Sequence, residues 1–297
     1  MSDSTPSLEE TRREIDAIDD ALHDLLIRRT EAVQWIAAAK RGSAPFVPFR
    51  AAFRPSREAQ ILRRLSGRHR GDLPREVLVF LWRAIMSAKL ALQSPFSVYV
   101  FAPEGRAGLW DTARAHFGAG IPFIACSTPL HALQGCAQDA SSIAVVPYPQ
   151  SEDSLPAWWS HMAQLDHEGP RVVARLPFMG GSPDNQALAF AAAPTEPTGE
   201  DTTLILIEVS GDTSRTRLAS LFKQASLPAQ IIAAAQDAQG KGPIQFCLEI
   251  EGFLREGDPR LLGFAERARD CLNLLFVAGG YANPIAFEAA RQGQATP

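Results

Sequence analysis

The first forty residues carry one long helical repeat of apolar side chains. Residues 7–41 contain no proline or glycine, and Ile15, Leu22 and Ile36 fall at seven-residue spacing, with Arg29 in the third position of the series. Side chains at this spacing lie on one face of an α-helix. The pattern therefore predicts a single long amphipathic helix that ends near residue 40.

Three basic residues share this apolar face. Arg29 occupies a seam position, Lys40 lies four residues beyond Ile36, and Arg12 lies three residues before Ile15. A cation in an apolar seam requires an anion, because an unpaired buried charge costs several kcal/mol. Either an anionic ligand or acids of the same bundle can supply it. The candidate acids are Asp19, Asp24 and Glu58.

Two further helices are predicted before residue 95. Pro55 and Pro74 stand where a first helical turn accepts proline, and they open apolar repeats over 55–65 and 74–93. The loop over 41–54 is long for a compact bundle and contains several apolar residues. We expect an all-helical segment whose long loop packs against another part of the chain.

From residue 96 the pattern changes to strands that alternate with helices. Strands are predicted at 96–101, near 123 and at 143–146, and helices at 109–117 and 130–137. This alternation predicts an α/β unit with a mainly parallel sheet. The stretch 179–200 is rich in Gly, Pro, Ala and Thr and is predicted to be a crossing segment and linker.

The last third of the chain predicts a second α/β unit. Its strands are expected at 203–209, 231–235, 245–251 and near 276, and its helices at 216–225 and 260–272. This βαββαβ order is that of a ferredoxin-like unit.

Composition and charge exclude several classes of protein. Residues 1–95 hold 16 basic and 12 acidic side chains, a net charge of +4, and the remainder carries −8. The local excess suits a small anionic ligand and is too modest for a nucleic-acid surface. The acidic start and the absence of a long apolar run predict a cytoplasmic protein without a membrane segment. The four cysteines lack metal-ligand spacing and are expected to be core side chains.

The helical segment resembles the AroQ-type chorismate mutases. The similarity covers TRREIDAIDDALHDLLIRRTEAVQWIAAAK, RPSREAQILRRL and LPREVLVFLWRAIMSAKLALQ. It implies a cofactor-free, metal-free enzyme with chorismate as substrate, and an intertwined homodimer that shares its long helix. The implied catalytic residues are Arg29, Lys40, Glu58 and Gln93.

The resemblance also implies a role for each residue. Arg12 of the neighbouring chain and Arg29 hold the two carboxylates, and Lys40 contacts a carboxylate and the ether oxygen. Glu58 contacts the ring hydroxyl, while Gln93 donates to the ether oxygen. A structural ion pair between Glu58 and Arg29 is the alternative for Glu58. The implied binding set is Arg12, Arg29, Lys40, Arg57 and Glu58, in which Arg57 supports charge and geometry.

Two positions depart from the resemblance. Lys89 stands where many relatives have a small hydroxyl residue, so it either adds a cation or lies on a solvated face. Arg54 stands where relatives often have an aspartate, and the loop before it is longer. Both changes affect the corner that would bind the hydroxyl.

The remainder resembles a prephenate dehydratase followed by an ACT domain. The strings VYVFAPEGRAGLWDTARAHFG, CSTPLHALQGC and ASSIAVVPYPQSEDS carry the dehydratase likeness. Gln150 and Ser151 replace the glutamate-asparagine pair of that family, its Thr-Arg-Phe motif does not occur, and one of its two lobes is expected to be missing. The ACT-like part has lost the small-residue signatures of phenylalanine binding, so we expect a dimerising or partner-binding role there.

The sequence therefore predicts a multidomain α plus α/β protein. Its predicted parts are a helical mutase domain at 1–95, a truncated dehydratase-like domain at 96–198 and an ACT-like domain at 199–297. The predicted function is conversion of chorismate to prephenate in aromatic amino-acid biosynthesis. The alternatives are a bifunctional mutase and dehydratase, or a non-catalytic regulatory protein of the shikimate pathway.

Overall fold

The first part of the chain is helical, as predicted. The computed structural model describes residues 6–104, 108–150, 157–164, 169–236, 240 and 242–286. Its first helices are α1 (Leu8–Arg41), α2 (Phe49–Ala52), α3 (Pro55–Arg68) and α4 (Arg75–Gln93). Ser7 opens α1 with a capping box, in which its hydroxyl accepts from the Glu10 N–H and the Glu10 carboxylate accepts from the Ser7 N–H.

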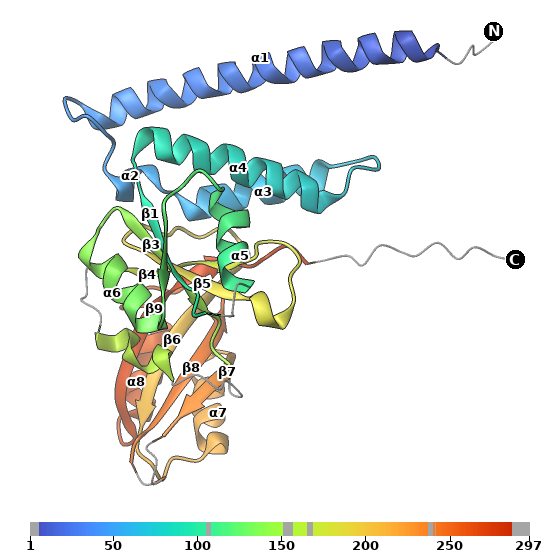
Figure 1. Cartoon of the computed structure of the whole chain (residues 1–297). Helices are drawn as coiled ribbons and strands as arrows, with labels where there is room; N and C mark the ends of the chain where they lie inside the picture. The colour runs from blue at the N-terminus through green and yellow to red at the C-terminus, as the bar shows by residue number, and fades with distance from the viewer. Residues whose placement is uncertain are drawn as a thin grey trace, which may run out of the picture.

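Helix α1 projects over the rest of the molecule, and none of its residues is buried (Figure 1). Within this helix only Arg29, Thr30, Val33 and Ala37 are half-buried. The predicted apolar face is therefore not covered by its own chain: Leu22 is 54% exposed. The exposed apolar side chains of α1 are Leu8, Ile15, Ile18, Leu22, Leu25, Leu26, Ile27, Trp35 and Ile36.

The long loop after α1 packs against the following unit, as expected. It contains the short helix α2, which the sequence pattern did not predict. Phe49 and Phe53 are buried there and join Leu90 and Phe96 in one apolar cluster. The rings of Phe49 and Phe96 lie 5.6 Å apart, so the loop ties α4 to the first strand of the sheet.

The middle unit contains the predicted elements and two strands that were not predicted. The predicted ones are β1 (Ser97–Phe101), α5 (Gly108–Phe117), β2 (Phe123–Cys126), α6 (Pro129–Gln138) and β3 (Ser142–Pro147). The additional ones are β4 (Arg171–Leu176), β5 (Ala187–Ala191) and the short 3-10 helices η1 (Trp158–Gln164) and η2 (Pro183–Asn185).

The linker prediction for 179–200 is thus wrong over β5. All five residues of this strand are buried, and it pairs antiparallel with both β3 and β4. Its alternation of alanine with larger apolar residues suits a strand covered on both faces. Strand β1 pairs in parallel with β2 and β3, whereas β5 is antiparallel to both of its neighbours, so the sheet is mixed rather than mainly parallel.

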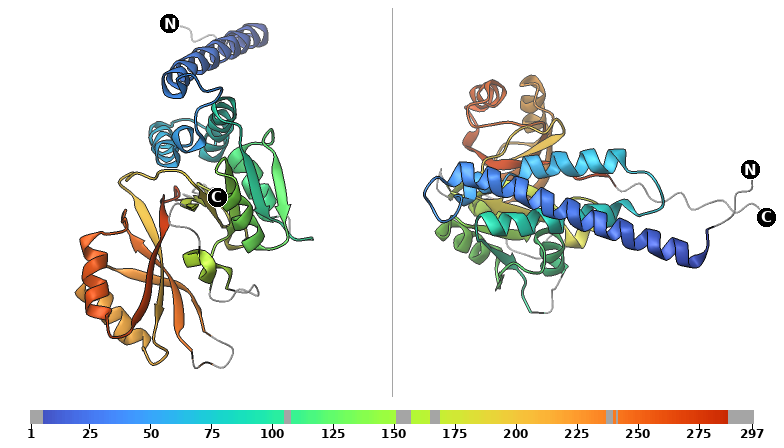
Figure 2. Two further views of the ribbon diagram at one scale, coloured as in Figure 1. Left: turned by 90° about the vertical axis from the view of Figure 1, so that its left-hand side faces the viewer. Right: turned by 90° about the horizontal axis from the view of Figure 1, so that it is seen from above.

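The C-terminal unit has the predicted ferredoxin-like order. It consists of β6 (Asp201–Val209), α7 (Arg215–Gln224), β7 (Ala229–Ala235), β8 (Ile244–Glu251), α8 (Pro259–Ala268) and β9 (Leu272–Ala282). Helices α7 and α8 cover one face of its strands (Figure 2), and the rings of Phe222 and Phe264 stack 4.1 Å apart between them.

Both α/β units share one sheet. In the described chain the strand order is β2-β1-β3-β5-β4-β9-β6-β8-β7. The two halves meet where Val172 of β4 pairs in parallel with Gly279 of β9. Gly279 has a φ of +125°, and a Cβ there would lie 2.4 Å from the Val172 carbonyl oxygen. Only glycine fits this approach. Strand β9 is also much longer than the short strand predicted near Phe276.

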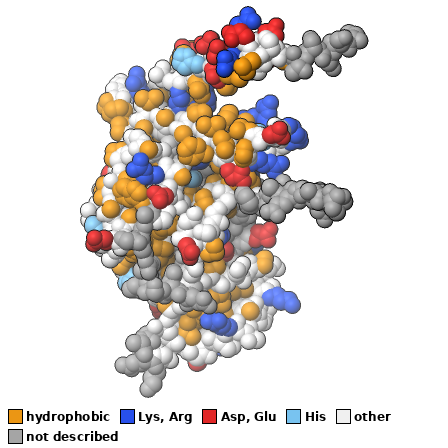
Figure 3. All heavy atoms as spheres, turned by 45° about the vertical axis from the view of Figure 1, so that its right-hand side comes forward, with side chains coloured by type: hydrophobic (Ala, Val, Ile, Leu, Met, Phe, Trp, Pro, Cys, Tyr) orange, Lys and Arg blue, Asp and Glu red, His pale blue; other side chains and the backbone are white. Residues whose placement is uncertain are grey.

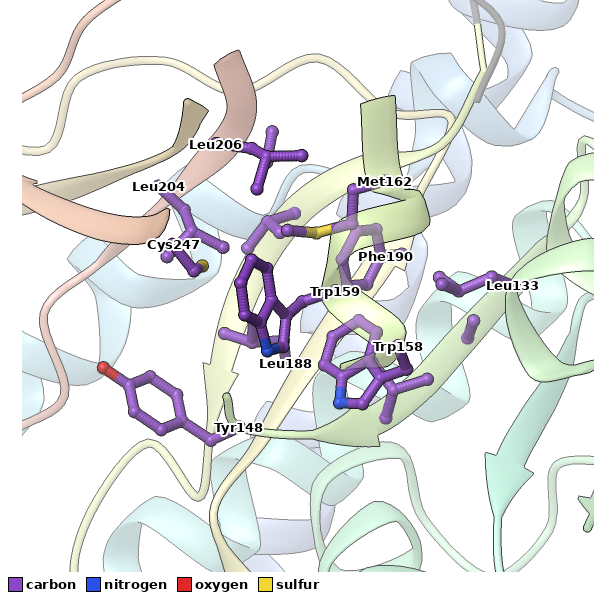
Figure 4. Packing of buried hydrophobic residues seen from close by; sticks show 14 of the residues in the cluster. Leu133, Tyr148, Trp158, Trp159, Met162, Leu188, Phe190, Leu204, Leu206 and Cys247 are labelled. Carbon is purple, nitrogen blue, oxygen red and sulfur yellow. The ribbon is translucent and has the colours of Figure 1, made fainter. Parts of the chain in front are cut away.

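One apolar cluster runs along a face of both halves of the sheet. Residues from β3, β5, β6 and β8 pack there beneath the aromatic side chains of η1 (Figure 4). Trp158, Trp159 and Met162 of η1 are all at most 3% exposed. The four cysteines are buried and unpaired, which agrees with their predicted role as core side chains. No helix in the described ranges is long and apolar enough to cross a membrane.

A polar cluster spans the joint between the two halves. Glu249 of β8 accepts hydrogen bonds from the hydroxyls of Tyr148 and Tyr281, and Arg175 of β4 pairs with it at 3.5 Å. The Arg175 guanidinium lies 4.1 Å from the centroid of the Tyr148 ring. Burial and the Glu249 charge raise the pKa of both tyrosines far above their ordinary value.

This cluster predicts a loss of stability at alkaline pH. The tyrosines stay neutral in the folded chain, whereas the unfolded chain releases their protons near pH 10, so the free energy of unfolding falls as pH rises above about 10. Tyr281→Phe should cost about 1–3 kcal/mol at pH 7 and make the alkaline fall shallower. Urea unfolding at pH 7 and pH 10.5 measures both, with Tyr99→Phe as control. An alkaline slope as steep in Tyr281→Phe as in wild type would contradict the assignment.

Candidate functional site

Helices α1, α3 and α4 bring three charged side chains together. They are Arg29 of α1, Glu58 of α3 and Lys89 of α4. Burial lowers the pKa of Arg29, and the Glu58 charge opposes that shift. Burial also lowers the pKa of Lys89, with a further contribution from the Arg29 charge. Two cations and one carboxylate therefore act on one another across three helices.

Arg29 is not satisfied within its own chain. Its Nη1 atom is buried without a hydrogen-bond partner among the described residues. None of the ion pairs found in the described part of the chain joins Arg12, Arg29 or Lys40 to an acid. A half-buried guanidinium with a buried, unused donor atom is the arrangement expected where an anionic ligand binds.

Lys89 and Lys40 each donate a hydrogen bond to an uncharged oxygen. The Lys89 ammonium donates to the Thr30 hydroxyl of α1. The Lys40 ammonium donates to the Ala51 carbonyl oxygen of α2 at 3.0 Å. Lys89 therefore faces α1 beside Arg29 rather than a solvated surface, and the structure holds Lys40 against the long loop.

Glu58 forms its close contact with a residue that sequence reasoning missed. Its Oε2 atom accepts from Nη1 of Arg83 at 2.6 Å. Arg83 is 5% exposed and belongs to the apolar stripe of α4, between Val79 and Met86. Like Arg29, Arg83 is a cation on an apolar helical face, so the same signal in the sequence could have identified it.

Three further predicted residues lie elsewhere on the same three helices. Arg12 is exposed on the projecting half of α1, 17 residues before Arg29 and so roughly 25 Å along the helix. Arg57 is exposed, and its Nη1 lies 3.5 Å from the Gln60 side-chain oxygen. Gln93 ends α4 and is half-buried, and its carbonyl accepts from the Val47 N–H.

Arg54 ties the helical segment to the chain between β5 and β6. Its guanidinium pairs with the Glu196 carboxylate at 2.5 Å, and the Glu196 N–H donates to the Ser56 hydroxyl. This contact accounts for an arginine at the position where the resemblance has an aspartate. Gln150 donates to the Pro183 carbonyl at 3.4 Å, and Ser151 lies outside the described residues.

The gathered groups suit anion binding. Fixed cations around a buried donor can hold carboxylates and stabilise negative charge that develops during a reaction. Among the described residues, no group of three or more His, Cys, Asp or Glu side chains is placed to hold a metal ion.

Comparisons with known proteins agree with a helical mutase segment. Residues 11–94 match the family model of chorismate mutase type II. A bifunctional chorismate mutase/prephenate dehydratase of Stutzerimonas stutzeri is 34% identical over 114 residues, which cover 38% of this chain and 31% of that protein. A protein of the same name from Pseudomonas aeruginosa is 32% identical over 143 residues, which cover 46% of this chain and 36% of that protein.

The matched stretches are therefore short relative to the relatives. The chain spans about a third of the length of these two proteins. Among solved structures, prephenate dehydratase from Streptococcus mutans aligns with a TM-score of 0.46 and 13% identity, covering 64% of this chain and 99% of that one. The architecture described above rests on the elements and strand pairings of this chain itself.

A buried histidine beneath this site predicts a loss of stability in acid. His116 ends α5 and is 7% exposed, and burial and the Arg83 charge hold its pKa well below 6.5. The unfolded chain takes up this proton below pH 6.5 and the folded chain does not, so stability falls as pH drops, by up to about 1.4 kcal/mol per pH unit. Urea unfolding from pH 7 to 5 should show a shallower fall in His116→Gln. The exposed His131→Gln should keep the wild-type slope, and equal slopes in all three proteins would refute the role of His116.

Proposed function

We propose that the chain is a cytoplasmic chorismate mutase that converts chorismate to prephenate in aromatic amino-acid biosynthesis. The observation that carries the proposal is the buried, unpartnered Nη1 of Arg29 beside Lys89 and Glu58. Chorismate is a dicarboxylate, so it supplies the anion that this donor lacks. The family match over 11–94 supports the same reaction.

The rearrangement suits a site made of fixed charges. It is a [3,3] pericyclic step in which a C–O bond breaks as a C–C bond forms, with no acid, base, nucleophile or cofactor bonded to the substrate. The protein must hold a compact conformer and stabilise negative charge on the ether oxygen. In this proposal Arg29 binds a carboxylate, Lys40 and Gln93 act at the ether oxygen, and Glu58 orients the ring hydroxyl. Arg57, which is exposed, contributes charge at the rim.

The proposed assembly is a homodimer in which a second copy covers α1. The exposed apolar stripe of α1 requires a partner surface, since such a face is costly to leave in water. Charge favours a second copy as that partner. The projecting half of α1 carries Glu9, Glu10, Glu14, Asp16, Asp19, Asp20 and Asp24, whereas the end of α3 and the loop to α4 carry exposed Arg64, Arg68 and Arg70 (Figure 3). In such a dimer Arg12 enters the neighbour's site.

A bifunctional mutase and dehydratase is the second candidate, because the relatives carry both names. The missing Thr-Arg-Phe motif and the replacement of the glutamate-asparagine pair by Gln150 and Ser151 count against it. A non-catalytic regulatory protein that binds chorismate is the third. In both of these candidates the ferredoxin-like unit would act as a dimerising or ACT-like regulatory part.

The activity is tested by the loss of chorismate absorbance at neutral pH, followed by acid quenching, which separates prephenate from phenylpyruvate. We expect turnover that yields prephenate alone. Arg29→Ala and Lys40→Ala should each lower kcat/KM by on the order of 100-fold or more, because the lost charge acts on the transition state. Arg217→Ala, on the distant helix α7, is the control. Formation of phenylpyruvate would favour the bifunctional enzyme. An intact dimer that does not turn over chorismate would favour the regulatory protein.

Mixing two inactive variants tests whether Arg12 acts across the dimer. Arg12→Ala and Arg29→Ala homodimers should both be inactive. After unfolding and refolding together, half of the chains pair with the other variant, and these heterodimers contain one site with both arginines. Activity should therefore return to about a quarter of wild type, if chains pair at random. Sedimentation equilibrium checks the dimer. Failure to recover activity in a mixed dimer would place Arg12 outside the site.

A further inference from the structure

We propose that Arg83 is a positioning residue of the mutase site: it holds Glu58 away from Arg29 and so keeps Arg29 available to the substrate. Because Arg83 also contacts the middle α/β unit, that unit contributes to the site. This inference rests on the proposed function.

Glu58 stands between two cations on different helices. It is near enough to Arg29 of α1 to stabilise that charge, yet its close contact, at 2.6 Å, is with Arg83 of α4. The side chains of Arg83 and Glu58 are 6% and 15% exposed, so water does little to screen them. A carboxylate released in this setting would pair with the nearest remaining cation, because a buried unpaired charge is costly.

Arg29 is the cation proposed to receive it, because the Glu58 charge already acts on Arg29 and the Arg29 Nη1 has no hydrogen-bond partner among the described residues. If Glu58 occupied it, the substrate carboxylate would have to compete with a carboxylate of the protein. The Arg83 contact removes this competition. It also fixes Oε2 of Glu58, and thus the orientation of the carboxylate that is proposed to hold the ring hydroxyl.

The middle unit fixes the other side of Arg83. Its Nε donates to the His116 carbonyl at 3.1 Å, and its guanidinium carbon lies 6.0 Å from the centroid of the Phe117 ring. Both residues end α5, where the unpaired carbonyls of a helix attract cations. The Ser87 hydroxyl donates to the same carbonyl at 3.4 Å but does not touch Glu58. Ser87 is therefore a matched control for the role of the α5 end alone.

The experiment compares Arg83→Met, Arg83→Lys, Ser87→Ala and Glu58→Gln in the full-length chain by steady-state chorismate turnover. We expect Arg83→Met to raise KM by on the order of 10- to 100-fold, with a smaller change in kcat, because Glu58 then blocks Arg29. Arg83→Lys keeps the charge and should recover most of this loss. Ser87→Ala should resemble wild type.

The decisive variant is the double one, Arg83→Met with Glu58→Gln. A neutral glutamine does not compete for Arg29, so the double variant should have a KM at least about 3-fold lower than Arg83→Met alone. A purely structural role predicts the opposite, since each substitution then adds its own damage. A KM of the double variant that equals or exceeds that of Arg83→Met would overturn the inference.

The outcomes separate this inference from the proposed function. If wild type does not turn over chorismate, both fail. If wild type is active and Arg83→Met behaves like Ser87→Ala, only the positioning role fails. Where Arg83→Met does not fold, as judged by circular dichroism, Arg83→Gln takes its place, since glutamine lacks the charge but retains an amide donor for the His116 carbonyl. The KM of Arg83→Gln is then compared with the KM of the double variant Arg83→Gln with Glu58→Gln, and the same criterion applies.

Discussion

The approach of β4 to β9 at Gly279 is the contact on which the rest of the architecture depends. Val172 and Gly279 pair where the two halves of the sheet meet, and a side chain at residue 279 would collide with the β4 backbone. The continuous sheet allows one apolar layer to run along both halves. The Glu249 cluster closes the same joint with polar contacts, so neither half presents a free edge there.

The helical segment is attached to this joint rather than linked to it by a flexible chain. Arg63 of α3 donates to the Thr198 hydroxyl and to the Glu200 and Asn283 carbonyls, beside the outer ends of β6 and β9. Phe178, which follows β4, packs with Leu62 of α3 and Met86 of α4. The helices that carry Glu58 and Lys89 are therefore fixed on a rigid support, whereas α1, which carries Arg29, has far fewer contacts with its own chain.

The sequence predicts those parts of the fold that local chemistry determines. The long helix follows from its apolar repeat and the absence of proline and glycine over 7–41, and the ferredoxin-like order follows from alternating strands and helices. β5 could not be predicted, because its alanines resemble a linker until β3 and β4 enclose them. The contact of Arg54 with Glu196 joins residues 142 positions apart, and no local pattern indicates it. The predicted site is assembled only in part by one chain, since Arg12 depends on the proposed dimer.

Two arginines on apolar helical faces show what the sequence rule can and cannot decide. Both Arg29 and Arg83 violate the apolar pattern, and the cost of burying a charge requires an anion for each. Arg83 finds its anion in Glu58 and a second acceptor in the His116 carbonyl, so the chain satisfies it internally. Arg29 retains a buried donor that has no partner in the part of the chain that the structure describes. The pattern thus identifies cations that need partners, and three-dimensional contacts then separate a cation that supports the site from one that awaits a ligand.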